Sequence, residues 1–209
     1  MAELRIAVRT LFGREDAEAP ESPGEAYVGR KILVGWEDMC SRSDWCMEYL
    51  PYTGNLLLDE EDHMLLQECL SAYVYGMYGV AVISSDAFLE RIITDSVETA
   101  GGEVGRQGFG KTLETFRSLK LIDRFIFDRI VRLHQIRNNL AHERGPDHKL
   151  RIFRRALKQR RIAQEIMKED AREAVCLAYG LAGLLQRNFP RLKLPGVDNR
   201  IVQRSIFRQ

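Results

Sequence analysis

Residues 123–142 read DRFIFDRIVRLHQIRNNLAH, and this stretch decides the fold. Its apolar and polar residues separate onto two sides of a helical wheel drawn at about 100° per residue. Gly145-Pro146 follows, a pair that is typical of a helix end. The stretch therefore predicts an amphipathic helix with a core-facing side formed by Ile126, Ile130, Leu133, Leu140 and Ala141, opposite Arg124, Asp128, Arg132 and Gln135.

Arg137 breaks this pattern, because the wheel places it near the middle of the apolar side, about 20° from Ile126. A desolvated guanidinium needs partners, since an unpaired buried charge is costly. Two explanations remain open. Arg137 reaches the surface or pairs with a carboxylate of another helix, or it lines a cleft or dimer interface and binds a phosphate through its planar fork.

His142 follows five residues later, about 140° from Arg137 in an unbroken helix. A histidine at a helix end is by itself typical of a surface residue or a cap. It gains interest beside Arg137, because an imidazole can transfer protons near neutral pH. Either a turn at the helix end or a dimer would be needed to bring the two side chains together.

The rest of the chain predicts further helices and no series of strands. Apolar residues recur at helical spacing from Asp59 to Val80, from Ser85 to Thr99, from Thr112 to Leu119, and over 162–189. We expect an all-α fold, a bundle of four to five helices over residues 59–189. Residues 1–58 are expected to form an irregular N-terminal appendage that includes an acidic linker at 13–25, and 190–209 a basic tail.

Charge divides the chain in two. Residues 1–100 hold 7 Lys and Arg against 19 Asp and Glu, and residues 101–209 hold 24 against 11. The basic half could bind phosphates, or it could face the acidic half of its own chain or of a second subunit. Within it, residues 149–161 contain seven Lys and Arg and no acid. We treat this segment and its neighbour as candidate RNA-backbone contacts, namely Arg144, Lys149, Arg151, Arg154 and Arg155.

The remaining composition indicates no membrane segment, cofactor or metal centre. No apolar run approaches the length of a membrane span, and Met1 to Phe12 does not resemble a signal peptide, so we expect a cytoplasmic protein. The four cysteines form no C-x-x-C pair and have no histidine at ligand spacing. They are expected to be reduced, structural thiols.

Residues 133–142, LHQIRNNLAH, resemble the R-x-x-x-x-H motif of the HEPN superfamily, with the polar Asn138 after the arginine. The order of elements is similar too: a helix with SSDAFLERII, a glycine-rich loop, a short helix with KTLETFRSL, and the motif helix. The pattern is similar to DUF4145-like HEPN proteins and, more loosely, to relatives of the mannitol-operon repressor. The resemblance covers roughly residues 60–187.

This resemblance implies a homodimeric, metal-independent endoribonuclease, such as a toxin or an antiviral effector. Arg137 would bind the scissile phosphate, His142 would act as general acid or base, and Asn138 would orient the phosphate or the histidine. An internal 2′-OH nucleophile needs mainly positioning and charge stabilisation. Glu90 is a candidate partner for Arg137.

The alternative to a nuclease is a non-catalytic HEPN regulator that binds a protein, such as an antitoxin, or a nucleic acid. One branch of the family carries a tyrosine two places after the histidine; Arg144 stands there instead, which argues against that branch.

Residues 105–112, GRQGFGKT, also match the phosphate-binding loop pattern G-x-x-x-x-G-K-[ST]. That chemistry needs a strand before the loop and a helix after it. A helix follows, but the preceding VETAGGEV predicts no strand. We therefore expect a loop that leads into the helix containing Leu113 and no NTPase site.

Overall fold

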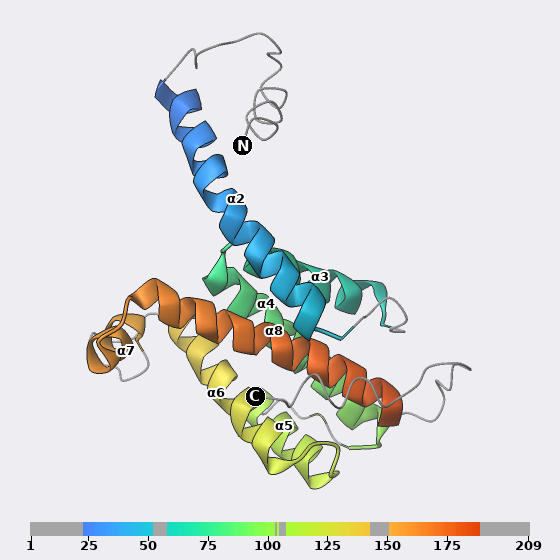
Figure 1. The fold of residues 1–209 in the computed structure, drawn as a ribbon. Coiled ribbons are helices and arrows are strands. Elements are labelled where there is room, and N and C mark those ends of the chain that lie inside the picture. Colours follow the sequence, from blue (N-terminus) through green and yellow to red (C-terminus); the bar gives the residue numbers. More distant parts are fainter. Residues whose placement is uncertain (1–22, 52–57, 103, 105–107, 143–150, 189–209) are drawn as a thin grey trace. The chain divides into compact units, whose positions relative to one another are not determined.

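The computed structural model describes residues 23–51, 58–102, 104, 108–142 and 151–188. In these ranges the chain forms seven helices and no strand (Figure 1). The all-α prediction is therefore confirmed. None of the helices in the described ranges combines the length and apolar character needed to cross a bilayer.

The contacts within the chain divide it into two compact units, residues 1–45 and 46–209. Helix α2, Pro23–Tyr49, continues from the first unit into the start of the second. The expectation of an irregular structure over 1–58 and of a linker reaching residue 25 is therefore wrong for residues 23–49. Gly29 and Gly35 and the uneven spacing of the apolar residues conceal the helical period here. The basic tail, residues 190–209, lies outside the described residues.

Helix α3, Glu60–Val74, begins at Asp59, whose side chain accepts a 2.7 Å hydrogen bond from the Asp62 amide. Arg91 of the next helix pairs with Asp59, Glu61 and Asp62 and so ties the start of α3 to that helix. The helix expected to reach Val80 ends at Val74. Gly76 adopts φ +77°, a conformation that most side chains disfavour, and a new helix begins at Tyr78.

Helices α4, Tyr78–Thr99, and α8, Ala163–Asn188, form the centre of the second unit. Figure 1 shows α8 crossing α4, and the two pack directly against each other. Helix α8 carries a row of fully buried alanines, and such small side chains suit a helix that is packed against several others. The row consists of Ala171, Ala174, Ala178 and Ala182.

Three further helices surround this pair: α5, Phe109–Ser118, α6, Arg124–Ala141, and α7, Ile152–Gln159. Helix α5 packs on α4 and α6, α6 packs on α4 and α8, and α7 packs on α8. Residues 59–189 therefore hold six described helices instead of the four to five expected, because the basic segment forms a helix of its own, α7. Helix α6 thus lies against α4 along the side that carries Arg137.

The described cysteines are free thiols, as expected. Cys69 is fully buried between α3 and its neighbours, and burial raises its pKa to about 12. Burial likewise raises the pKa of Cys176 to about 11. A thiol that stays protonated at neutral pH is a poor nucleophile, so these two residues are structural.

Candidate functional site

The candidate site begins with helix α6, whose start is fixed by Asp123. The Asp123 carboxylate accepts a 2.8 Å hydrogen bond from the Ile126 amide, as an N-cap does. The helix then buries a face that is formed by Ile126, Ile130, Leu133 and Ile136. The predicted core-facing side is confirmed for its first three members, whereas Leu140 is half-buried and Ala141 is exposed.

Arg137 lies on the side of α6 that faces α4, and its side chain is 25% exposed. Its Nε lies 3.2 Å from Asp86 Oδ2 on α4, and its Nη2 lies 3.7 Å from Glu90 Oε2, one helical turn further along. Its Nη1 donates a 3.0 Å hydrogen bond to Asn138 Oδ1. The guanidinium is therefore held between two carboxylates of α4 and its own neighbour, and part of it still reaches the surface.

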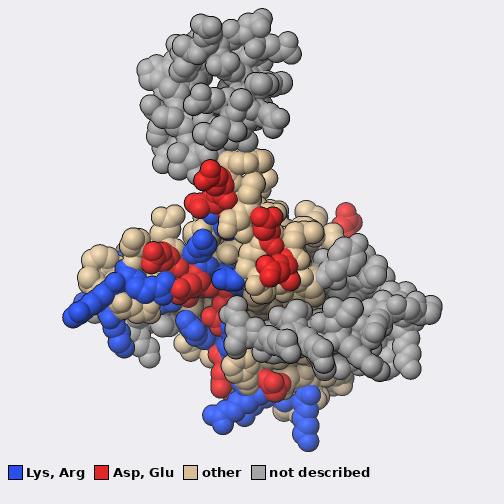
Figure 2. Space-filling model, viewed as in Figure 1, with Lys and Arg blue, Asp and Glu red and all other residues tan. Residues whose placement is uncertain are grey.

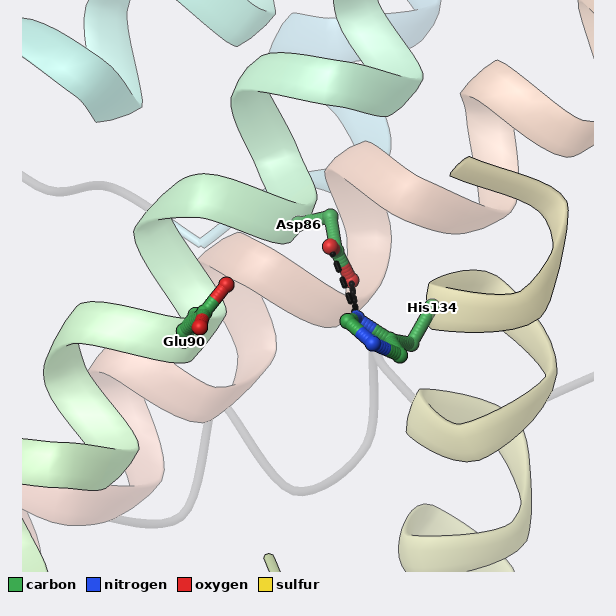
Figure 3. A group of neighbouring side chains, drawn as sticks. All are labelled: Asp86, Glu90 and His134. Atoms are coloured by element: carbon green, nitrogen blue, oxygen red, sulfur yellow. Dashed lines mark hydrogen bonds and ion pairs between the residues drawn. The ribbon is translucent and has the colours of Figure 1, made fainter. Parts of the chain in front are cut away.

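Asp86 is the centre of this arrangement, because its side chain is fully buried in the middle of α4. His134 of α6 contributes a second contact, with Nδ1 3.0 Å from Asp86 Oδ2. A carboxylate only accepts, so Nδ1 is the donor of this hydrogen bond. Figure 3 shows Asp86 and His134 pointing toward each other, with Glu90 beside them on α4. The ring of Phe109 on α5 lies 4.9 Å from the His134 ring and covers one side of it.

His142 does not meet Arg137 within the described part of one chain. It is the C-cap of α6, with an extended backbone at φ −122° and ψ 141°, and its side chain is exposed. Helix α6 therefore ends at His142, the point at which a turn of the backbone was one of the two ways to bring His142 toward Arg137. No hydrogen bond or ion pair joins His142 to Arg137 among the residues that the structure describes.

The basic residues expected to contact RNA differ in their exposure and in their partners. Arg151 and Arg154 are exposed at the start of α7, where Figure 2 shows Lys and Arg atoms gathered on the surface. Arg155 instead pairs through both Nη atoms with Asp170 of α8, which is buried, and its own side chain is 11% exposed. This pairing argues against Arg155 as a substrate contact and makes it a tie between α7 and α8. Arg144 and Lys149 lie outside the described residues.

The phosphate-binding loop pattern at 105–112 follows a helix, α4, and no strand. Residues 105–107 lie outside the described part; Gly108 adopts φ +84° and α5 starts at Phe109. Thr112, which would face a magnesium ion in such a loop, is buried. The motif therefore lacks the strand that its chemistry requires.

The sequence analysis did not identify Asp86 or His134 as site residues, although Asp86 is recognisable as a charged residue on the apolar side of its helix. On the wheel of α4, Asp86 lies about 20° from both Ile93 and Val97, which are buried. It breaks its helix's apolar side just as Arg137 does. Two residues of opposite charge that each interrupt the core-facing side of a helix are candidates to form an ion pair with each other. Only the packing of α4 on α6 identifies the pair, which is separated by about 50 residues of chain.

Comparisons with protein-family models, with curated proteins and with solved structures find no match to this chain.

Proposed function

We propose that the chain is a HEPN-type, metal-independent endoribonuclease that acts as a homodimer. The observation that carries this proposal is the state of Arg137. A guanidinium stands on the core-facing side of α6, is fixed by Asp86 and Glu90, and is still 25% exposed beside the polar end of the helix. A fixed and partly desolvated arginine is suited to bind a phosphate, because little reorganisation is then needed.

The proposed chemistry assigns one task to each residue. Arg137 binds the scissile phosphate and stabilises the charge that develops when the ribose 2′-OH attacks. Asn138, already hydrogen-bonded to Arg137, sets the direction of the guanidinium. His142 transfers a proton to or from the reacting oxygens. The exposed Arg151 and Arg154 on the basic helix α7 would contact the RNA backbone.

A non-catalytic regulator is the second candidate, and one observation favours it. Arg137 is engaged by two carboxylates, and His142 is not joined to it within the described part of one chain. An arginine in this state could serve only to hold α6 on α4. The protein would then bind an RNA or a protein partner through the basic surface without cleaving anything.

RNA cleavage in EDTA separates these two functions. We expect the purified protein to cut single-stranded RNA and to leave 2′,3′-cyclic phosphate ends. Arg137→Ala and His142→Ala should each lower the rate by about a hundredfold or more, since each removes a group that acts in the transition state. Equal background activity of wild type and both variants would contradict the nuclease proposal.

Two matched variants control for charge and for surface effects. Arg124→Ala removes an arginine from the same helix, where its side chain is 82% exposed. His63→Ala removes an exposed histidine from α3. Both should cleave RNA at the wild-type rate. If His63→Ala lost as much activity as His142→Ala, the loss of RNA cleavage in His142→Ala could not be attributed to the motif.

A further inference from the structure

The contact between α4 and α6 holds three side chains whose donor atoms could share one ion. Asp86 and Glu90 stand one turn apart on α4, and His134 faces them from α6 (Figure 3). One ligand atom from each of the three lies within 4.8 Å of the others. The cluster combines an imidazole nitrogen with two carboxylate oxygens, a donor set suited to divalent transition metals.

The spacing of Asp86 and His134 already fits a shared metal ion. Bonds of about 2.0 to 2.2 Å in a tetrahedral site place neighbouring donor atoms about 3.3 to 3.6 Å apart, close to the separation of these two side chains. His134 Nδ1 lies 3.0 and 3.3 Å from the two Asp86 oxygens. Glu90 needs only a side-chain rotation, because its carboxylate is 42% exposed and not confined by the core. Its exposure and that of His134, 24%, also leave water free to complete the coordination.

Asp86 is incompletely satisfied by the groups that now surround it. Within the described residues, His134 supplies its aligned hydrogen bond, whereas the buried Nε–H of Arg137 lies near it without forming one. A fully buried carboxylate normally accepts several such bonds. Arg137 thus neutralises the charge of Asp86 but does not use its remaining lone pairs.

Arg137 and a metal ion cannot occupy this cluster together. The guanidinium lies 3.2 Å from Asp86 and 3.7 Å from Glu90, so a divalent ion on these oxygens would be within a few ångströms of it. The two cations repel each other strongly at such a distance in a partly buried site. Binding of an ion would therefore require the side chain of Arg137, which is 25% exposed, to turn outward and to leave Asp86 and Glu90.

We propose that Asp86, Glu90 and His134 form a site for a divalent transition-metal ion, with Zn²⁺ as the reference ion, and that the ion displaces Arg137. Nδ1 of His134 must give up its proton when the ion binds, because only an unprotonated nitrogen is a ligand, and in the neutral ring this proton moves to Nε2. The cluster therefore has two mutually exclusive states: in one the guanidinium of Arg137 contacts the carboxylates, and in the other the metal ion does. The regulatory consequence, inhibition of RNA cleavage by Zn²⁺, rests on the proposed nuclease function; the binding itself does not.

Calorimetry with ZnCl₂ on EDTA-treated and dialysed full-length protein tests the site. We expect His134→Gln and Glu90→Gln to weaken binding by at least about tenfold, the cost known for disturbing even groups outside the ligand set. Arg137→Met should strengthen binding by about tenfold or more, because it removes the competing charge. His63→Gln, an exposed histidine on α3, is the matched control and should bind as wild type does.

The response to Arg137→Met is decisive, because an adventitious surface site would not depend on this residue. Wild-type affinity in His134→Gln, or unchanged affinity in Arg137→Met, overturns the proposal. Co²⁺ gives a second readout: its visible absorption should appear in wild type and vanish in His134→Gln while circular dichroism shows an intact helical fold. RNA cleavage in EDTA is measured separately, so a protein that binds Zn²⁺ and cleaves nothing contradicts the nuclease and leaves the metal site standing.

Discussion

At the scale of single residues, the informative feature is a charge in the wrong place. Arg137 and Asp86 each break the core-facing side of their helix, and each is the reason the other is tolerated. A buried carboxylate without a partner would be far more costly than the pair. The same pairing also fixes the guanidinium at the surface, so a structural role and a role in binding phosphate are compatible.

Asp86→Asn is expected to destabilise the protein by about 2 to 3 kcal/mol, because it removes the charge that compensates Arg137 in a mostly buried setting. The partial exposure of Arg137 keeps this value below that of a fully buried pair. Urea denaturation followed by circular dichroism measures the loss.

Asp128→Asn is the matched control for this measurement. Asp128 forms an exposed pair with Arg124, with 62% of its side chain accessible, so its loss should cost less than about 0.5 kcal/mol. Equal stability of Asp86→Asn and wild type would show that the contact with Arg137 and His134 contributes nothing to folding.

At the scale of elements, the bounds of α6 agree with the sequence to within a residue or so at either end. The wheel, the polar side and the stop before Gly145-Pro146 are local properties, and they fix a helix of Arg124–Ala141. The same reasoning failed at Gly76, where the apolar spacing continues through a turn and conceals the break between α3 and α4. It failed also for α2, whose apolar residues show no clear period.

The N-cap of α6 gives a prediction at this scale. Asp123→Ala should lower the free energy of unfolding by about 1 kcal/mol, because the Ile126 amide loses its acceptor. Asp123→Asn keeps a side-chain acceptor and should lose only a small part of this. Hydrogen exchange of the first-turn amides of α6 gives an independent measure: protection that is unchanged in Asp123→Ala would contradict the capping role.

At the scale of the whole molecule, the charge division of the sequence has a partial explanation within the fold. Arg137 of the basic half meets Asp86 and Glu90 of the acidic half. Other cations meet acids of their own half, as Arg155 does with Asp170. Exposed basic residues remain on α7, where Figure 2 shows them together. Both alternatives left open by composition therefore keep some support: ion pairs within the chain use part of the positive charge, and exposed Lys and Arg side chains lie on α7.

Assembly is the prediction at this scale. Because Arg137 and His142 are not joined within one described chain, the proposed site needs two copies, and light scattering at micromolar concentration should give twice the chain mass. Mixing Arg137→Ala with His142→Ala after joint refolding should then restore about a quarter of wild-type activity, since half of the dimers are mixed and each has one intact composite site. A monomeric mass, or no recovery on mixing when the wild type is active, would contradict the composite site.

The sequence by itself determined the all-α class, the extent of the motif helix and the misplaced Arg137. These depend on helical period and end signals, which act between residues a few positions apart. Glu90 was already a candidate partner for Arg137 in the sequence, but only the tertiary structure showed that Asp86 meets Arg137 as well. Asp86 and His134 lie 48 positions apart, and their contact depends on how α4 packs against α6. It also reassigned Arg155 from a candidate RNA contact to a tie with Asp170. Charges cannot be left unpaired in a core, but the partner that satisfies each one is set by packing and not by local pattern.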